Sequence, residues 1–247
     1  MKVVYHEGYN EVYSGDPASA LGRIESIYKE LYGSYEFVTP NAASDHDLEL
    51  VHGETHIQYV KRLELTYEVA KLAVGGAIRA SELAVEGEPA FGLIRPPGHH
   101  ASRDSSWGFC YFNNVAIAVE KLRQSRRIER ALIVDIDLHY GDGTANIFSN
   151  RPDVSYFHMP HTDGLEKLSE YLEAKTGYGI LALSAGFDRH VDDWGGTLRT
   201  EDYRTIGITV KKSVERECEG KRFAVLEGGY NHSVLGKNVK ALLSGMT

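Results

Sequence analysis

The sequence lacks the features that would place it in a membrane, in a disulfide framework or on a nucleic acid. No apolar run approaches the ~18 residues that a membrane-spanning helix needs, and the first five residues predict a strand rather than a signal peptide. Only two cysteines occur, Cys110 and Cys218, too few for a disulfide framework. The net charge is −8 and no long Lys or Arg run is present, which favours a cationic substrate or partner. We therefore expect a soluble, cytoplasmic protein that binds neither nucleic acid nor membrane.

What is present is an ordinary globular composition, with 42% hydrophobic and 25% charged residues in 247. No repeat or linker interrupts it, so we expect a single domain over residues 1–247. Apolar runs predict strands at 2–5, 37–40, 90–94, 131–139, 154–158, 180–183 and 222–226. Helical periodicity predicts helices at 17–31, 55–65, 67–84, 115–122, 143–148, 166–174, 203–218 and 233–243. This alternation indicates an α/β fold of three layers, α/β/α, with a doubly wound, mostly parallel sheet.

Two helix starts carry specific signals. Asp16 followed by Pro17 is typical of an N-cap and a first helical position, and we expect that helix to continue through Leu21 to Leu31. Asn113 or Asn114 can cap the helix at 115–122.

The segment from Ala131 to Gly143 is an apolar, β-branched run that ends in a Gly-Asp-Gly turn. If the strand continues through it, Asp135, Asp137 and His139 share one face, because alternate side chains point the same way. A buried carboxylate without a partner is costly. A divalent cation bound by Asp137 and His139 would supply that partner.

Three other predicted strands also end in unusual polar residues. Arg95-Pro-Pro-Gly leads to the adjacent His99 and His100, the strand at 180–183 leads to Asp188, and the last strand leads to Gly228-Gly229-Tyr230. Ligands of parallel sheets bind beyond the carboxyl ends of the strands. We therefore expect these groups to converge on one site.

These residue types together suit the hydrolysis of an amide. Asp137, His139 and Asp188 would bind zinc and leave one position open, and iron(II) tolerates the same ligands. His99 or His100 would act as general base and acid, oriented by Asp135 and Asp142. Tyr230 would donate a hydrogen bond to the oxyanion. Spacing alone favours core positions for Phe109 and Phe112.

Five motifs in the same order resemble those of the histone deacetylase and acetylpolyamine amidohydrolase superfamily. They are Arg-Pro-Pro-Gly-His-His, Gly-Phe-Cys-Tyr-Phe-Asn-Asn, Asp-Ile-Asp-Leu-His-Tyr-Gly-Asp-Gly-Thr, Ser-Ala-Gly-Phe-Asp and Leu-Glu-Gly-Gly-Tyr-Asn. The resemblance implies an arginase-like deacetylase fold and zinc on Asp137, His139 and Asp188. It further implies removal of acetyl groups from acetyl-lysine or an acetylpolyamine by a metal-activated water.

The resemblance also implies individual roles. His100 with Asp142 would shuttle the proton, while His99 with Asp135 would be the more buried electrostatic partner. Tyr230 would polarise the carbonyl, and a monovalent cation such as K⁺ could bind near Asp135, Asp137 and His139, partly through backbone carbonyls. The residues expected to contact substrate are Gly108, Phe109, His158, Gly228 and Gly229, with Phe109 forming one wall of an acyl-lysine tunnel.

Two segments are shorter than the family's usual pattern. Only Met159 to Gly164 separates the strand at 154–158 from the next helix, where relatives carry a glycine-rich loop with a second tunnel aromatic. Residues 62–66 likewise fall where relatives carry a rim loop with an acidic residue. Tyr140 stands where many relatives have a second histidine. The first two departures concern the rim and not the metal site.

Two other functions account for part of this pattern. An arginase-like binuclear ureohydrolase needs further bridging carboxylates near the third ligand, but Gly186 and His190 flank Asp188 at the relevant spacing. A non-catalytic acyl-lysine binding protein would be expected to have lost a metal ligand, a dyad histidine or Tyr230, and none is lost. The acyl donor and any assembly into a homo-oligomer stay open.

Overall fold

The computed structural model describes residues 1–247 and is built on a seven-stranded sheet, ordered β2-β1-β3-β7-β6-β4-β5. All strand pairs are parallel, so every strand ends at the same edge of the sheet. The strands are β1 Lys2–Val4, β2 Glu36–Val38, β3 Ala90–Gly92, β4 Ala131–Asp135, β5 Val154–His158, β6 Leu181–Ala185 and β7 Arg222–Leu226. The predicted α/β fold with a mostly parallel sheet is confirmed.

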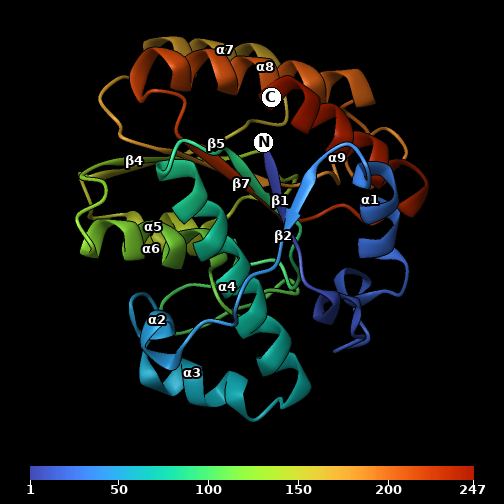
Figure 1. Cartoon of the computed structure of the whole chain (residues 1–247), viewed down its shortest axis with the longest axis vertical. Helices are drawn as coiled ribbons and strands as arrows, with labels where there is room; N and C mark the ends of the chain where they lie inside the picture. The colour runs from blue at the N-terminus through green and yellow to red at the C-terminus, as the bar shows by residue number, and fades with distance from the viewer.

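Helices cover both faces of this sheet (Figure 1). One layer contains α1, α7, α8 and α9, and the other contains α4, α5 and α6, with α2 and α3 beyond the end of α4. The helices are α1 Arg23–Leu31, α2 Asp45–Glu49, α3 Glu54–Lys61, α4 Leu65–Val85, α5 Asn114–Gln124, α6 Asp142–Phe148, α7 Gly164–Ala174, α8 Thr200–Glu217 and α9 His232–Met246. The three-layer arrangement follows from this coverage.

The central strands β4, β6 and β7 are buried along their whole length. Their sequences, Ala-Leu-Ile-Val-Asp, Leu-Ala-Leu-Ser-Ala and Arg-Phe-Ala-Val-Leu, are nearly continuous apolar runs, as expected of strands with helices on both faces. They belong to one hydrophobic core of 64 residues. This core fixes the strand ends from which the polar residues of the sequence motifs project.

Asn113 connects the fold to the predicted site. Its side-chain oxygen accepts a hydrogen bond from the Ala116 N–H at 3.0 Å, so α5 begins directly after it. The same side chain donates to the Ala101 carbonyl and to Thr144 Oγ1, both at 3.0 Å. One capping residue thereby joins the loop after His100 to the start of α6.

The structure corrects two predicted elements and adds one that was missed. Asp16 caps only a short 3₁₀ turn at Pro17–Ser19, and α1 starts separately at Arg23 because Gly22 has a left-handed φ of 84°. Leu21 is consequently 73% exposed and outside any helix. Strand β4 ends at Asp135, which places Asp137 and His139 in the following loop. Helix α2 was not predicted from the sequence.

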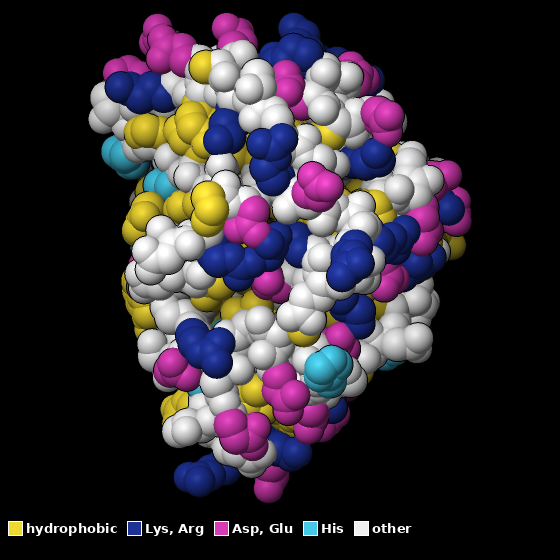
Figure 2. Space-filling model, turned by 90° about the vertical axis from the view of Figure 1, so that its left-hand side faces the viewer, with side chains coloured by type: hydrophobic (Ala, Val, Ile, Leu, Met, Phe, Trp, Pro, Cys, Tyr) yellow, Lys and Arg dark blue, Asp and Glu magenta, His cyan; other side chains and the backbone are white.

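No helix combines the length and the apolar character needed to cross a bilayer. In the side view, acidic and basic side chains are interspersed over the visible surface (Figure 2). That face therefore offers no extended surface of one charge.

Candidate metal centre and active site

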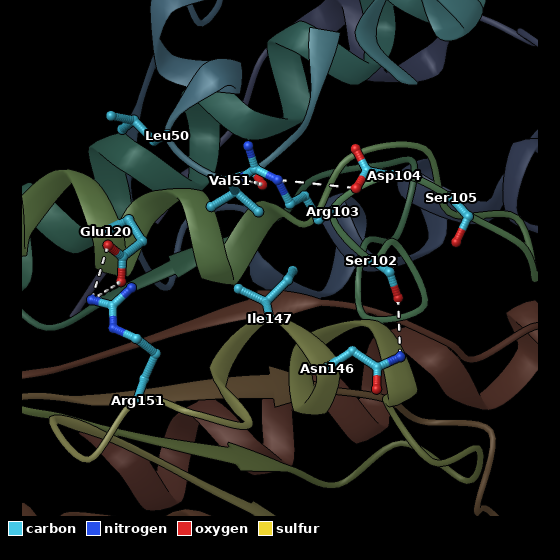
Figure 3. A pocket seen from close by; sticks show the side chains of 10 residues that line it. All are labelled: Leu50, Val51, Ser102, Arg103, Asp104, Ser105, Glu120, Asn146, Ile147 and Arg151. Carbon is cyan, nitrogen blue, oxygen red and sulfur yellow. Dashed lines mark hydrogen bonds and ion pairs between the residues drawn. The ribbon is translucent and has the colours of Figure 1, made fainter. Parts of the chain in front are cut away.

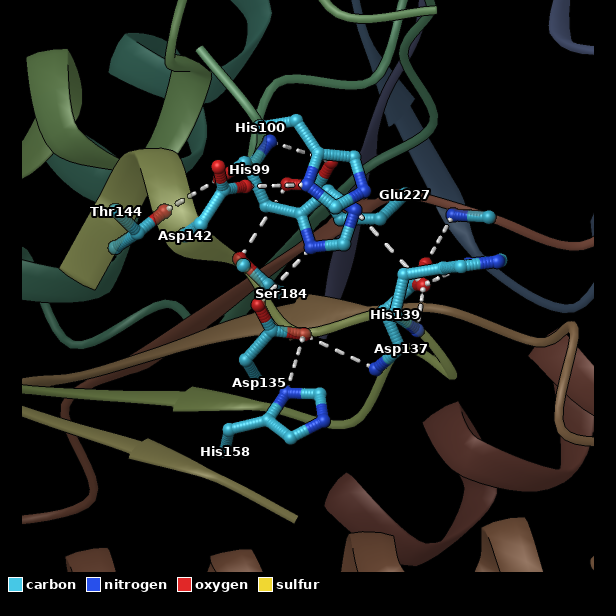
Figure 4. Close-up of polar contacts among 12 residues, drawn as sticks. His99, His100, Asp135, Asp137, His139, Asp142, Thr144, His158, Ser184 and Glu227 are labelled. Carbon is cyan, nitrogen blue, oxygen red and sulfur yellow. Dashed lines mark hydrogen bonds and ion pairs between the residues drawn. The ribbon is translucent and has the colours of Figure 1, made fainter. Parts of the chain in front are cut away.

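Three potential metal ligands meet where β4 and β6 end side by side. The ligand atoms of Asp137, His139 and Asp188 all lie within 4.8 Å of one another. His139 Nδ1 is 3.3 Å from Asp137 Oδ1 and 3.1 Å from Asp188 Oδ2. Figure 4 shows His139 and Asp137 on the loop that follows β4. The structure therefore brings together the three residues that the sequence predicted as ligands.

The electrostatics of this cluster favour a cation. Burial raises the pKa of Asp188 to about 6, and the Asp137 charge acts in the same direction. Burial opposes ionisation of Asp137 as well, but the His99 charge and hydrogen bonds from His139 and the Gly228 N–H keep its pKa below the usual value. Hydrogen bonds to both carboxylates raise the pKa of His139 to about 10. Two carboxylates and one imidazole around one point fit a divalent metal such as zinc or iron(II).

Two histidine–carboxylate pairs lie beside the cluster. His99 Nδ1 is 3.1 Å from Asp135 Oδ2, and His100 Nδ1 is 2.7 Å from Asp142 Oδ1. Burial lowers the pKa of His99, but the charges of Asp137 and Asp135 outweigh it and hold the pKa well above its usual value. Burial, aided by the His99 charge, lowers the pKa of His100 to about 4. The His99 imidazole therefore carries a positive charge, whereas His100 presents a neutral imidazole near pH 7.

Glu227, which the sequence did not single out, fixes the loop that carries both histidines. Its Oε2 accepts hydrogen bonds from the N–H groups of Gly98 at 2.7 Å and His99 at 3.2 Å, and Oε1 accepts from Ser184. His99, Cys110 and Glu227 also offer donor atoms within 4.8 Å of one another. Burial raises the pKa of the Cys110 thiol, and Glu227 already has these partners. We assign no metal there.

Trp107 is a second residue that sequence reasoning missed. Its indole stacks on His100 with ring centroids 3.8 Å apart, and its Nε1–H donates to both oxygens of Asp142, at 3.1 and 2.9 Å. The next residue, Gly108, has a φ of 58°, and a Cβ there would lie 2.6 Å from His100 Cδ2. Gly108 therefore gives His100 room, and the substrate contact expected of Gly108 stays a prediction.

Tyr230 lies among aromatic side chains at the exposed side of the cluster. Its ring stacks on Trp194 at 4.1 Å and lies edge-on to Phe109 at 5.9 Å. Phe109 is only partly buried, whereas spacing alone had favoured a core position. Asp193 Oδ2 accepts hydrogen bonds from the N–H groups of Tyr230 and Asn231, both at 2.8 Å, and fixes the turn. Burial is the main cause that raises the pKa of Tyr230, so its hydroxyl stays a donor.

His158, which was expected to contact substrate, lies between Arg189 and Asp135. Its Nε2 is 3.2 Å from Arg189 Nη2, and its Nδ1 is 4.0 Å from Asp135 Oδ1. Figure 4 places it on the side of Asp135 away from His99. The Nδ1 of His158 is buried without a hydrogen-bond partner, and the substrate contact expected of His158 stays a prediction. Tyr156 supports Asp135, through a hydroxyl that donates at 3.0 Å.

The two glycines before Tyr230 position other groups. A Cβ on Gly228 would lie 2.5 Å from Asp137 Oδ2, so only glycine permits the close approach of its N–H to that ligand. The Gly229 carbonyl accepts a hydrogen bond from Arg23 Nε at 2.8 Å. These contacts give both glycines a structural task, and the substrate contacts expected of them stay a prediction.

A separate surface cavity of about 410 Å³ lies against α5 and α6 (Figure 3). Its polar lining includes Ser102, Arg103, Glu120 and Arg151, and no residue of the metal cluster or of the two dyads takes part. Arg151 is paired with Glu120 across it. The cavity is thus distinct from the site at the strand ends.

A parallel α/β fold with a buried Asp-His-Asp cluster, two His–Asp pairs and a tyrosine at one edge is typical of a metal-dependent hydrolase. Comparison with known proteins narrows this class. The model of the histone deacetylase domain matches residues 18–168, more than half of the chain. The chain belongs to the histone deacetylase family and is a hydrolase of the kind that acts on amide bonds.

Three relatives illustrate the similarity. A probable deacetylase of Methanothermobacter thermautotrophicus is 31% identical, with 98% of this chain and 86% of the relative aligned. A histone deacetylase-like amidohydrolase of Pseudomonas aeruginosa is 29% identical over 77% of this chain and 65% of its own length. Polyamine deacetylase HDAC10 of Mus musculus is 27% identical over 80% of this chain and 39% of its own length. The chain thus spans less than two thirds of the last two proteins.

The crystal structure of the HDA15 HD domain shares the fold, with a TM-score of 0.85, 21% identity, and 100% of this chain and 90% of that chain covered. The alignment to the Methanothermobacter relative also shows that this chain is shorter within the aligned region. It extends over 296 positions, whereas 98% of 247 residues is about 242, so roughly 54 positions face gaps in this chain.

Proposed function

We propose that the chain is a zinc-dependent deacetylase acting on small cationic amines of the acetylpolyamine or acetyl-lysine type. The observation that carries this proposal is the convergence of the Asp137, His139 and Asp188 cluster with His100 and Tyr230 at one edge of the sheet. The first three residues would bind zinc. When bound, zinc would polarise the amide carbonyl and acidify a water molecule.

His100 is the group we assign to proton transfer. Its Nδ1 is bound to Asp142, which leaves Nε2 to accept a proton from the attacking water and return it to the departing amine. The lowered pKa keeps the imidazole neutral, and so basic, near pH 7. His99, whose pKa is raised, keeps its proton and contributes positive charge.

Tyr230 is the group we assign to the oxyanion. A phenol with a raised pKa donates a hydrogen bond but does not ionise, which suits an oxygen that becomes negative in the transition state. Asp193 holds the backbone of Tyr230, and Trp194 packs against the ring. These contacts of the backbone and the ring support the role proposed for the hydroxyl.

The surroundings of the site support a cationic amine as substrate. Trp107 and Trp194 are each more than half exposed beside His100 and His139, and such rings attract ammonium groups. The net charge of −8 acts in the same direction over longer distances. Short connections at Arg62–Glu64 and Met159–Asp163 leave little rim for a folded protein substrate to contact.

The two competing functions have less support. A Cβ on Gly186 would lie 2.2 Å from Asp137 Oδ2, so no carboxylate-bearing residue fits there to bridge a second metal. His190 is turned away, with its Nδ1 accepting from the Asp192 N–H at 3.1 Å. A passive acyl-lysine binder would not need His100, Asp142 and Tyr230 together.

The test combines metal analysis with acetate release from an acetylated diamine. We expect about one zinc per chain, loss of metal and activity in His139→Ala, and retained metal with at least about 10²-fold lower kcat in Tyr230→Phe. Tyr171→Phe is the matched control, because that hydroxyl lies on α7, where the ring stacks on Phe157. Full activity of the metal-free protein or of Tyr230→Phe would contradict the proposal.

A further inference from the structure

The residue after the third ligand, Arg189, is a buried cation surrounded by carbonyl oxygens. The residue is only 1% exposed. Its Nε–H donates to the carbonyls of Ile136 and Asp137, both at 3.0 Å, and Nη1 donates to the Pro160 carbonyl at 3.1 Å. Nη2 donates to the Met159 carbonyl and lies 3.2 Å from His158 Nε2. Its partners thus come from the loops after β4 and β5.

Arg189 makes no ion pair with any carboxylate within 4.0 Å, although burial lowers the pKa of its guanidinium. The charges of Asp137, Asp188 and Asp135 oppose that effect, and a guanidinium keeps its proton in proteins. A cation held by several backbone carbonyls, and balanced by carboxylates beyond direct contact, resembles a monovalent metal ion in a carbonyl-lined site.

The sequence had suggested a K⁺-type ion near Asp135, Asp137 and His139, bound partly through backbone carbonyls. The residues present do not fit such an ion, because the Asp137 carbonyl already accepts a hydrogen bond from Arg189. A metal ion at the same place would leave a buried guanidinium without acceptors, which is costly.

We propose that Arg189 replaces a monovalent cation behind the metal site, so that this enzyme needs no K⁺ or Na⁺ there. Its planar fork joins the loop carrying Asp137 and His139 to residues 158–160 and holds the ligands in place. Its charge offsets the buried carboxylates Asp135, Asp137 and Asp188. Arg189 is thus a positioning residue that acts through the metal ligands.

The experiment measures the melting temperature of the zinc-loaded protein in KCl, NaCl and choline chloride at equal ionic strength. Wild type should melt within about 1 °C in all three salts. Arg189→Ala, which opens a carbonyl-lined space, should lose about 5 °C or more in choline chloride and recover a large part of it in KCl or NaCl. Arg189→Lys keeps a charge and should respond less to the salt.

Arg222→Ala is the matched control. Arg222 is also buried and donates to backbone carbonyls, those of Met246 and Gly220, but at the opposite end of β7. Its loss should lower the melting temperature equally in every salt. A K⁺ response of wild type as large as that of Arg189→Ala would overturn the proposal, as would a folded Arg189→Ala with no cation response. If Arg189→Ala does not fold, the wild-type protein alone tests the proposal, because its melting temperature should be the same in all three salts. The melting readout needs no turnover, so it is independent of the proposed reaction.

Discussion

The indole of Trp107 lies flat against the imidazole of His100, with ring centroids 3.8 Å apart and an interplanar angle of 30°. The same indole donates its N–H to Asp142, the carboxylate that orients His100. One exposed side chain therefore restrains both members of the proton-transferring pair. Because Asp142 is partly exposed, this second donor also limits its rotation towards solvent.

Trp107→Phe should separate these two contributions. Phenylalanine keeps a ring against His100 but loses the N–H, so we expect kcat to fall about 5- to 10-fold, equivalent to roughly 1 to 1.4 kcal/mol. Trp107→Ala removes the ring as well and should lower kcat further. Steady-state kinetics on a small acetylated amine measures both variants. If kcat is unchanged and only KM rises, Trp107 contributes to substrate binding alone and does not position His100.

The two histidines should differ in kind. His100→Ala removes the neutral base and should lower kcat by about 10²-fold or more, with substrate binding preserved. His99→Ala removes a fixed charge and should be milder. Both variants should retain metal, because neither residue is a predicted ligand, and metal content is the control. The opposite ranking would mean that the roles of the two dyads are reversed.

The sequence allowed the sheet and the ligand cluster to be predicted because both depend on local patterns. Asp137, His139 and Asp188 follow apolar strands, and parallel strands bring their carboxyl ends together. The error at Leu21 has a local origin as well. Leu21 fits the helical spacing of Ile24 and Ile27. The left-handed backbone of Gly22, however, prevents the helix from extending back to Leu21.

The groups that were missed are recognisable only through contacts between distant segments. Arg189 has acceptors on residues 136, 137, 159 and 160, and no spacing rule relates a single arginine to backbone carbonyls so far away. Trp107 reaches Asp142, 35 residues later, from a loop without periodicity. The roles of Tyr156 and Glu227 could be found only once the strand register was known. The register places the Tyr156 hydroxyl beside Asp135 and the Glu227 carboxylate beside the N–H of His99.

His52 should make the fold sensitive to acid. Its ring is buried, with Nδ1 2.9 Å from the Ser102 carbonyl and Nε2 accepting from the Asn113 N–H at 2.9 Å. Burial, with the His56 charge, lowers its pKa to about 3. Between that value and ~6.5 the unfolded chain binds a proton that the folded chain does not. This contribution to the free energy of unfolding is therefore complete above ~6.5 and is lost as the pH falls towards 3.

Urea denaturation at pH 7 and pH 5 measures this effect. His52→Gln cannot titrate, so its loss of unfolding free energy on acidification should be about 1 to 2 kcal/mol smaller than that of wild type. Equal losses would show that the His52 proton does not distinguish the folded from the unfolded chain.

Two short connections predict weak discrimination among substrates. Three residues, Arg62–Glu64, join α3 to α4, and five, Met159–Asp163, join β5 to α7. The archaeal alignment places roughly 54 positions opposite gaps in this chain. A rim supplies binding energy to parts of the substrate remote from the amide, whereas the groups assigned to bond breaking lie on the strand ends. Reduced loops should therefore lower discrimination and leave the chemistry intact.

We accordingly expect a small acetylated amine and a set of acetyl-lysine peptides to be hydrolysed with similar efficiency, whatever residues flank the lysine. The measurement is kcat/KM for peptides of equal length that differ only in those neighbours, with the free acetylated amine as reference. In the proposed site Phe109 would lie against the same part of every substrate, so it should not distinguish the peptides. A spread beyond about 100-fold in kcat/KM corresponds to roughly 2.7 kcal/mol of transition-state discrimination. It would require contacts with the residues that flank the acetyl-lysine and would contradict a reduced rim.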